Sequence, residues 1–245
     1  MNNYKVYNFD QVESTNDEVK SLFAQNGGQD VIVITKSQTK GRGRRGRRWY
    51  SPPGNLYVSF SKTPPVNPVS LGQISLVVGI AVHRVVSKLL GPKGQVALKW
   101  PNDVLINKMK VGGILVETEQ FPGQENLTCI IGVGINFLTS PEMVIFPACS
   151  LYEFTKDLPD MTDFVKDVII EFDQLYDLWI QHGFENIRSE WLLVSYGLGK
   201  PVSARAENGF EVYGRFLTLS LDGAVVICDD EGNEYLVRSS EIMYL

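Results

Sequence analysis

Residues 41–49 form the most strongly charged segment of the chain, with five arginines and three glycines among nine residues. Arginine side chains bind phosphate and carboxylate oxygens through paired hydrogen bonds, and glycines let the backbone approach such a group closely. Trp49, at the end of the segment, suits stacking on an aromatic base. These residue types indicate a local anion-binding loop. This motif alone leaves open the alternative of a disordered arginine–glycine contact with nucleic acid.

Residues 99–103 place Lys99 and Asp103 at the two ends of a Trp-Pro-Asn sequence. A cation beside a carboxylate suits the binding of phosphate or of a magnesium–phosphate complex. Asn102 and Asp103 also favour a tight turn, because such side chains bond nearby backbone groups, so a purely structural turn is the alternative. Asp103 is a candidate for an indirect magnesium contact, and the other metal ligands stay unknown.

Three further segments combine small or polar residues with the end of a predicted strand or helix. Lys110 precedes Gly112 and Gly113, and two adjacent glycines in a strand mark a β-bulge or the close approach of a ligand. Residues 132–136 end a strand and match neither the dinucleotide-binding nor the phosphate-loop glycine pattern. Residues 14–16 begin a helix, where capping of the first turn by a hydroxyl is the simplest interpretation.

The charge of the chain is unevenly distributed. The net charge is −5, yet residues 36–50 contain seven basic residues and no acid. The rest of the chain carries 16 basic and 28 acidic residues, a balance of −12. A general nucleic-acid-binding protein is normally basic over a whole face, so this distribution favours a local anion site. Three widely spaced cysteines and two histidines argue against a disulfide scaffold or a structural zinc site, and they fit the cytoplasm.

The apolar pattern predicts the helices and strands that would position these segments. Helical spacing predicts helices over residues 14–26, 71–90, 161–181 and 187–196. β-branched or alternating runs predict strands over residues 31–34, 55–62, 96–100, 104–106, 111–117 and 127–133, with tight turns that favour antiparallel neighbours. No apolar run is expected to approach the roughly 20 residues of a membrane-spanning helix. The N-terminus lacks the features of a secretory signal.

The pattern of predicted secondary structure changes at Gly197. From there, short strands alternate with turn sequences such as Asp222-Gly223, which is the pattern of a small β-barrel of about 45 residues. We therefore predict a first domain over residues 1–196 and a C-terminal β domain over residues 197–245.

Taken together, the order and spacing of these motifs resemble the biotin–protein ligase family. The resemblance covers about residues 10–245 and rests on residues 14–16, Gln38 with residues 41–46, residues 99–103, Lys110 with residues 112–117, and residues 132–136. It implies an α+β fold with a mixed sheet and flanking helices, like that of class II aminoacyl-tRNA synthetases, plus a C-terminal SH3-like β-barrel. It also implies an enzyme that forms biotinyl-5′-AMP from biotin and MgATP. That enzyme would transfer biotin to one lysine of a biotin carboxyl carrier protein of acetyl-CoA carboxylase.

The resemblance assigns site residues in three overlapping groups. Lys110 and Lys99 would supply positive charge, residues 42–44 would close over the ligand, and Asp103 would orient a cation or the incoming lysine. The catalytic group is Arg44, Lys110, Lys99 and Asp103. The biotin-binding group is Ser14, Thr15, Asn16, Gln38, Gly41, Arg42, Gly43, Arg44, Lys110, Gly112 and Gly113. The ATP- and adenylate-binding group is Arg42, Arg44, Arg45, Arg47, Trp49, Asn102 and Asn136.

Some family members carry an N-terminal helix-turn-helix, but only 13 residues precede Ser14, too few for such a module. We therefore expect a ligase that binds neither DNA nor a membrane, and monomer and homodimer both stay open. Two other functions also stay open. One is an acyl-adenylating ligase for lipoate or another carboxylic acid, which a titration with biotin and lipoate would distinguish. The other is a non-enzymatic nucleic-acid binder, against which the acidic remainder of the chain argues.

Overall fold

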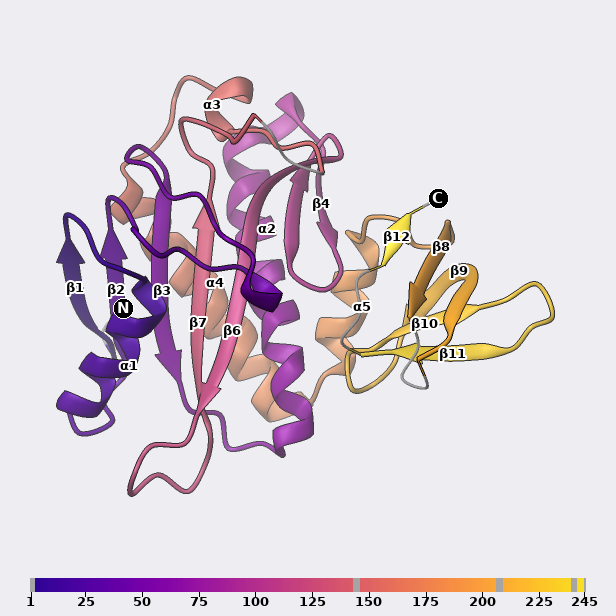
Figure 1. The fold of residues 1–245 in the computed structure, drawn as a ribbon, viewed down its shortest axis with the longest axis horizontal. Coiled ribbons are helices and arrows are strands. Elements are labelled where there is room, and N and C mark those ends of the chain that lie inside the picture. Colours follow the sequence, from indigo (N-terminus) through magenta and orange to yellow (C-terminus); the bar gives the residue numbers. More distant parts are fainter. Residues whose placement is uncertain (1–2, 143–145, 206–208, 239–241, 245) are drawn as a thin grey trace.

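The structure is a computed structural model that describes residues 3–142, 146–205, 209–238 and 242–244. In these residues a seven-stranded sheet has the order β1-β2-β3-β7-β6-β5-β4 (Figure 1). β1 and β2 are parallel, and every other pair of neighbours in this sheet is antiparallel. The strands are β1 (Lys5–Phe9), β2 (Val31–Thr35), β3 (Leu56–Lys62), β4 (Val96–Lys99), β5 (Asp103–Ile106), β6 (Met109–Glu119) and β7 (Thr128–Ile135).

Helices cover the two faces of this sheet unequally. Figure 1 shows α2 (Ile74–Leu90) and α4 (Met161–His182) behind the sheet, and α1 (Thr15–Gln25) in front of its first strands. α1 packs mainly on β2, β3 and β7, with its apolar residues against the β-branched residues of β2. β2 is therefore buried on both faces, which explains its continuous apolar run. On the sheet face that carries α1, loops cover the strands β5 and β6.

A five-stranded antiparallel sheet with the order β11-β10-β9-β8-β12 follows α5 (Glu185–Leu193). It is joined to the larger sheet by a hydrogen bond of 3.1 Å from Trp100 Nε1 to the carbonyl of Gly223. Arg188 of α5 also donates to the carbonyl of Leu219. The strands are β8 (Pro201–Arg205), β9 (Glu211–Leu219), β10 (Val225–Cys228), β11 (Glu234–Val237) and β12 (Met243–Tyr244).

The predicted fold class is confirmed: a mixed sheet with flanking helices precedes a separate antiparallel sheet consistent with an SH3-like domain. The remaining elements are short, namely α3 (Leu151–Phe154) and the 3₁₀ turns η1 (Arg44–Gly46), η2 (Pro68–Gln73) and η3 (Gly91–Lys93). The predicted basic loop thus contains only one such turn. The boundary at residue 197 stays a prediction.

Three sequence expectations differ from the structure. β1 was not predicted, because it is an edge strand in which none of the five residues is fully buried. The helix expected from residue 71 begins at Ile74, after the turn η2. The helix expected to reach residue 196 ends at Leu193, because the backbone beyond it bonds to Leu98: Leu98 N–H donates to Val194, and Tyr196 N–H donates to Leu98.

The segment Pro68–Lys93, which contains α2, corrects the expectation about membrane-spanning length. By length and composition this helical stretch is able to cross a membrane. In the structure, 67% of its most apolar window is buried inside the protein, against the larger sheet and α4. The expectation failed because a helix that is mostly buried in a protein core carries few charges, as a membrane helix does.

Candidate functional site

Three glycines, Gly113, Gly132 and Gly134, lie together on the sheet face that α1 covers only in part. Gly113 is opposite Gly134 in the β6–β7 pair, and Gly132 is two residues before Gly134, so all three face the same side. A Cβ on Gly132 would lie 2.5 Å from Asn16 Oδ1, and one on Gly134 would lie 2.6 Å from Trp49 Nε1. We call these three residues the glycine floor, because other side chains rest directly on its backbone.

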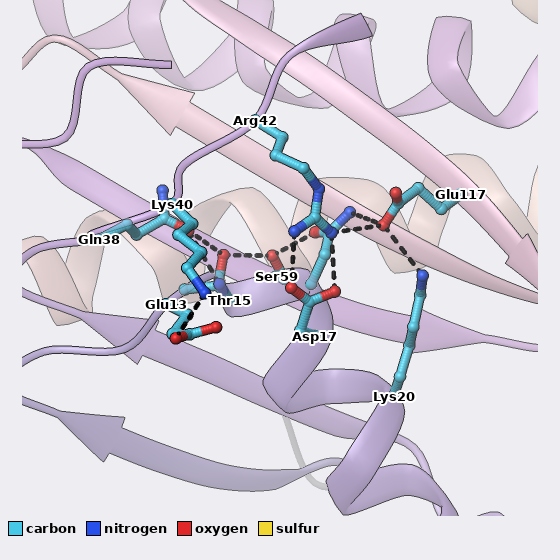
Figure 2. A network of polar contacts seen from close by, with 10 residues as sticks. Glu13, Thr15, Asp17, Lys20, Gln38, Lys40, Arg42, Ser59 and Glu117 are labelled. Atoms are coloured by element: carbon cyan, nitrogen blue, oxygen red, sulfur yellow. Dashed lines mark hydrogen bonds and ion pairs between the residues drawn. The ribbon is translucent and has the colours of Figure 1, made fainter. Parts of the chain in front are cut away.

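A polar cluster of Thr15, Asn16, Gln38 and Ser59 borders the glycine floor. Figure 2 shows Thr15 between Gln38 and Ser59. The hydroxyl of Ser59 lies 2.6 Å from Thr15 Oγ1 and 2.7 Å from Asn16 Oδ1. Gln38 Oε1 accepts from the backbone N–H of Thr15 at 2.8 Å and from its hydroxyl at 3.1 Å. A serine hydroxyl carries one hydrogen, so it satisfies only one of its two acceptors at a time. The cluster therefore keeps an acceptor available for an N–H donor.

The local backbone brings Gln38 to the start of α1. Val12 and Gln38 form a parallel β-bridge, and Thr39 N–H donates to the carbonyl of Val12. Ser14 is the N-cap residue of α1 and is buried, but its side chain makes no capping hydrogen bond. The capping interpretation of this hydroxyl is therefore wrong, since the first turn is reached instead by Gln38, which accepts from Thr15 N–H.

Lys110, Asp103 and Trp49 converge on the other side of the glycine floor. Lys110 Nζ lies 2.6 Å from Asp103 Oδ1 and 5.3 Å from the centre of the Trp49 ring. Asp103 is directly opposite Gly113 in the β5–β6 pair, which places the carboxylate beside the floor. The Nε1 of Trp49 is buried and has no hydrogen-bond partner in the described part of the chain. A buried polar atom without a partner is unusual in a folded protein and points to a ligand.

The glycine pair of β6 has two separate structural roles. The register of β5 and β6 shifts between Val104 and Leu105, so the predicted bulge is present. Gly112 faces away from the glycine floor, because a Cβ there would lie 2.5 Å from Ile135, which belongs to the core under α2. Only Gly113 lies on the floor, and any contact of Gly112 with a ligand would have to come from its backbone.

Arg42 connects the basic loop to α1 and β6. Its guanidinium makes two hydrogen bonds of 2.6 and 2.7 Å to Asp17 and lies 3.5 Å from Glu117, as Figure 2 shows. The hydrogen bonds from Arg42 hold the pKa of Asp17 below its usual range, so the pair is charged at neutral pH. The loop is thereby anchored at its start beside the polar cluster.

The rest of the basic loop folds back on itself. Gly43 N–H donates to the carbonyl of Arg47 at 2.7 Å, and Trp49 N–H donates to the carbonyl of Gly41. A Cβ on Gly41 would lie 2.5 Å from both Ser51 Oγ and the Trp49 carbonyl, so only glycine fits. Among the other arginines predicted to belong to the site, Arg44 is half-buried, whereas Arg45 and Arg47 are exposed.

Three predicted site residues make structural contacts in the described chain. Asn102 Nδ2 donates to the carbonyl of Ile114, and Asn136 Nδ2 donates to the carbonyl of Cys149. Neither bond is the local bond of the turn alternative, because the acceptors lie 12 and 13 residues away in the sequence. Lys99 is opposite Asp103 in the β4–β5 pair, but its Nζ lies 3.8 Å from the centre of the Phe146 ring. Direct ligand contacts of these three residues stay predictions.

Sequence reasoning gave no role to Ser59, Asp17 or Glu117. Ser59 is fully buried in β3 together with Ser61, and two hydroxyls at alternate positions of a buried strand are the signal that was available. Glu117 is only the last residue of the motif at residues 112–117, and Asp17 follows the motif at residues 14–16. Their contacts with Arg42 join positions 25 and 75 residues away in the sequence, which no local pattern reveals.

The described residues contain no group of three or more histidine, cysteine or acidic side chains able to hold a metal. Magnesium is commonly held by one or two carboxylates together with nucleotide phosphates. Asp103, which lies beside Lys110, is suited to supply one such carboxylate. Burial raises the pKa of the Cys129 and Cys149 thiols to about 12, so neither is a nucleophile at neutral pH.

Known proteins resemble this chain over most of its length. The model described as "Biotin/lipoate A/B protein ligase family" matches residues 8–136. The "Biotin--[acetyl-CoA-carboxylase] ligase" of Paracoccus denitrificans is 30% identical, over 96% of this chain and 98% of that protein. The "Bifunctional ligase/repressor BirA" of Bacillus subtilis is also 30% identical, over 95% of this chain and 71% of that protein. The solved biotin protein ligase from Aquifex aeolicus in complex with biotin and ATP superposes with a TM-score of 0.82 at 28% identity, covering 98% of this chain and 99% of that one.

Proposed function

Because the chain belongs to the biotin/lipoate A/B protein ligase family, among its biotin protein ligases, we propose that it forms biotinyl-5′-AMP and transfers biotin to a carrier lysine. The acceptor would be the carboxyl carrier protein of acetyl-CoA carboxylase, as the name of the Paracoccus relative suggests. The observation that carries the proposal is the sheet face itself. Along it, the glycine floor joins a buried polar cluster to the Lys110 cation.

The polar cluster is suited to the urea head of biotin. A urea offers two N–H donors and one carbonyl acceptor, and each unmatched buried polar group costs about 1–3 kcal/mol. Asn16 Oδ1 and Thr15 Oγ1 share a single Ser59 hydrogen, so one of them accepts from a urea N–H without losing a partner. The absence of side chains at Gly132 and Gly134 allows a flat ring to lie on the strands.

The first reaction joins the biotin carboxylate to the nucleotide. A carboxylate oxygen attacks the α-phosphorus of ATP, the new O–P bond gives the mixed anhydride, and pyrophosphate leaves with the electrons of the broken P–O bond. Two anions must approach each other, so positioning and fixed positive charge are what the protein supplies. Lys110 is the cation that lies beside the floor, and Arg44 with the rest of the basic loop supplies more charge above it.

The second reaction transfers the acyl group. The neutral lysine amine attacks the acyl carbon, the nitrogen releases one proton to water as the amide bond forms, and AMP leaves with the electrons of the C–O bond. Asp103 lies beside this carbon when the carboxylate is near Lys110, so it is placed to orient the incoming ammonium and to accept its proton. In the first reaction, magnesium bound to the nucleotide phosphates would neutralise charge that develops on the leaving pyrophosphate.

Incubation with ATP, magnesium, biotin and a biotin carboxyl carrier domain tests this proposal. Mass spectrometry is expected to show one biotinyl group on one lysine of the carrier, together with pyrophosphate release. A parallel reaction with lipoate is expected to give no product. Lipoylation without biotinylation would support the lipoate alternative, and a salt-dependent RNA shift unaffected by biotinyl-5′-AMP would support the nucleic-acid alternative. We also propose a cytoplasmic location, which the free thiols of Cys129, Cys149 and Cys228 fit.

The basic loop is expected to be protected when ligand binds. Arg45 and Arg47 are exposed, so trypsin should cleave near Arg44 in the protein alone. Biotin plus ATP should slow that cleavage, because the adenylate phosphate draws the guanidinium groups together. Limited proteolysis followed by mass spectrometry measures the cleavage rate at each bond. Equal rates with and without both substrates would contradict closure of the loop.

A further inference from the structure

Glu117 occupies a central position in the network of Figure 2, yet the proposed reaction assigns it no role. Its Oε2 accepts a 2.9 Å hydrogen bond from Asn16 Nδ2. The same oxygen lies 3.3 Å from Lys20 Nζ and 3.5 Å from the Arg42 guanidinium. Glu117 shares the face of β6 with Gly113, since the two residues are four apart in one strand. It therefore connects α1, the basic loop and the floor strand.

The chemistry of the partners shows what Glu117 contributes to Asn16. An amide side chain has an acceptor end and a donor end of nearly the same shape, and either end can be turned toward a hydroxyl. Ser59 therefore accepts both orientations of Asn16. A carboxylate accepts only, so the contact with Glu117 requires that Nδ2 points toward it and that Oδ1 points toward Ser59 and Gly132. Of these two partners, only Glu117 distinguishes the ends of the amide.

We propose that Glu117 is a positioning residue that holds the acceptor end of Asn16 over Gly132 and so makes the site select ligands that offer an N–H donor there. The proposal rests on the proposed function, in which that donor is a urea N–H of biotin. With the amide reversed, Nδ2 would face the urea N–H, and two donors would meet in a buried site. Glu117 acts through Asn16 and does not itself touch the ligand.

Biotin affinity measured by calorimetry without ATP tests this assignment. Glu117→Ala is expected to weaken biotin binding about 10- to 100-fold, the range for one buried hydrogen bond lost or opposed. Glu117→Gln keeps an acceptor but no longer enforces the orientation, so its loss should be smaller. Lys20→Met is the matched control: it removes the ion pair with Glu117 and leaves the Asn16 bond, so affinity should stay at the wild-type value.

Two further measurements separate positioning from general damage to the fold. In a double-mutant cycle, Asn16→Ala with Glu117→Ala should bind biotin no more weakly than Asn16→Ala alone, because Glu117 acts through Asn16. The wild-type protein should also prefer biotin to at least one of the two analogues in which a urea N–H is replaced by CH₂, and Glu117→Ala should lose that preference.

Additive effects in the cycle, or an undiminished preference in Glu117→Ala, would overturn the assignment. If Glu117→Ala fails to fold, the isosteric Glu117→Gln decides, since wild-type affinity and an unchanged preference in that variant would overturn it as well. Failure of the wild-type protein to bind biotin at all would refute the proposed function instead.

Discussion

Replacement of Lys110 by alanine is expected to abolish formation of the acyl-adenylate while leaving the fold intact. Lys110 Nζ lies beside Asp103 and the Trp49 ring, at the end of the glycine floor where the carboxylate and phosphate would meet. Removal of one positioned charge from a transition state typically costs about 10²- to 10³-fold in rate. Here the loss would also leave Asp103 as an unpaired negative charge beside two anions, so the effect should lie at or above that range.

Pyrophosphate release in the presence of biotin and ATP measures this step. Circular dichroism would show whether the variant keeps its secondary structure. Lys166→Ala is the matched control, because Lys166 is an exposed lysine of α4 on the opposite side of the sheet. It should release pyrophosphate at the wild-type rate. Release at that rate by Lys110→Ala would remove Lys110 from the reaction centre.

Gly132→Ala is expected to weaken biotin binding by about 100-fold, with little change in stability. Its methyl group would lie 2.5 Å from Asn16 Oδ1, so Asn16 must move away from the floor and from Ser59. One lost hydrogen bond and an obstructed surface together account for a loss of this size. The replacement also restricts the unfolded chain, which offsets part of the strain in the folded state.

Calorimetric titration with biotin and thermal unfolding of the same sample check both parts of this prediction. Gly72→Ala is the control, because a Cβ there meets no atom within 4 Å. Gly134→Ala should behave like Gly132→Ala, although by a different route, since its methyl group displaces the Trp49 ring. Wild-type affinity in both floor variants would show that biotin does not lie on these strands.

Local sequence patterns predicted most of the fold because burial on one or both faces leaves a clear signature. α4 has one apolar stripe, and β2 is apolar from Val31 to Ile34, as its burial along the whole strand requires. β1 escaped prediction because an exposed edge strand has no such signature. The end of α5 was misplaced because the backbone of residues 194–196 bonds to Leu98 of β4, nearly 100 residues earlier.

For the site, the motifs identified which segments matter but not which atoms meet. The glycines of residues 112 and 113 look equivalent in the sequence, yet the alternation of the strand turns one to the core and one to the floor. Glu117 and Asn16 are 101 residues apart, and their hydrogen bond depends on how α1 lies across β7. Long-range pairing of this kind requires the fold, because no spacing rule connects the two residues.

The central claim is that an acyl-adenylate lies along the glycine floor, between the polar cluster and Lys110. A crystal structure with biotinyl-5′-AMP bound tests it most directly. In that structure the urea is expected to contact Asn16 and Ser59 over Gly132, and the phosphate is expected to lie beside Lys110, beneath residues 41–48. Density for the adenylate at any other place on the molecule, with Trp49 still resting on Gly134, would contradict the account.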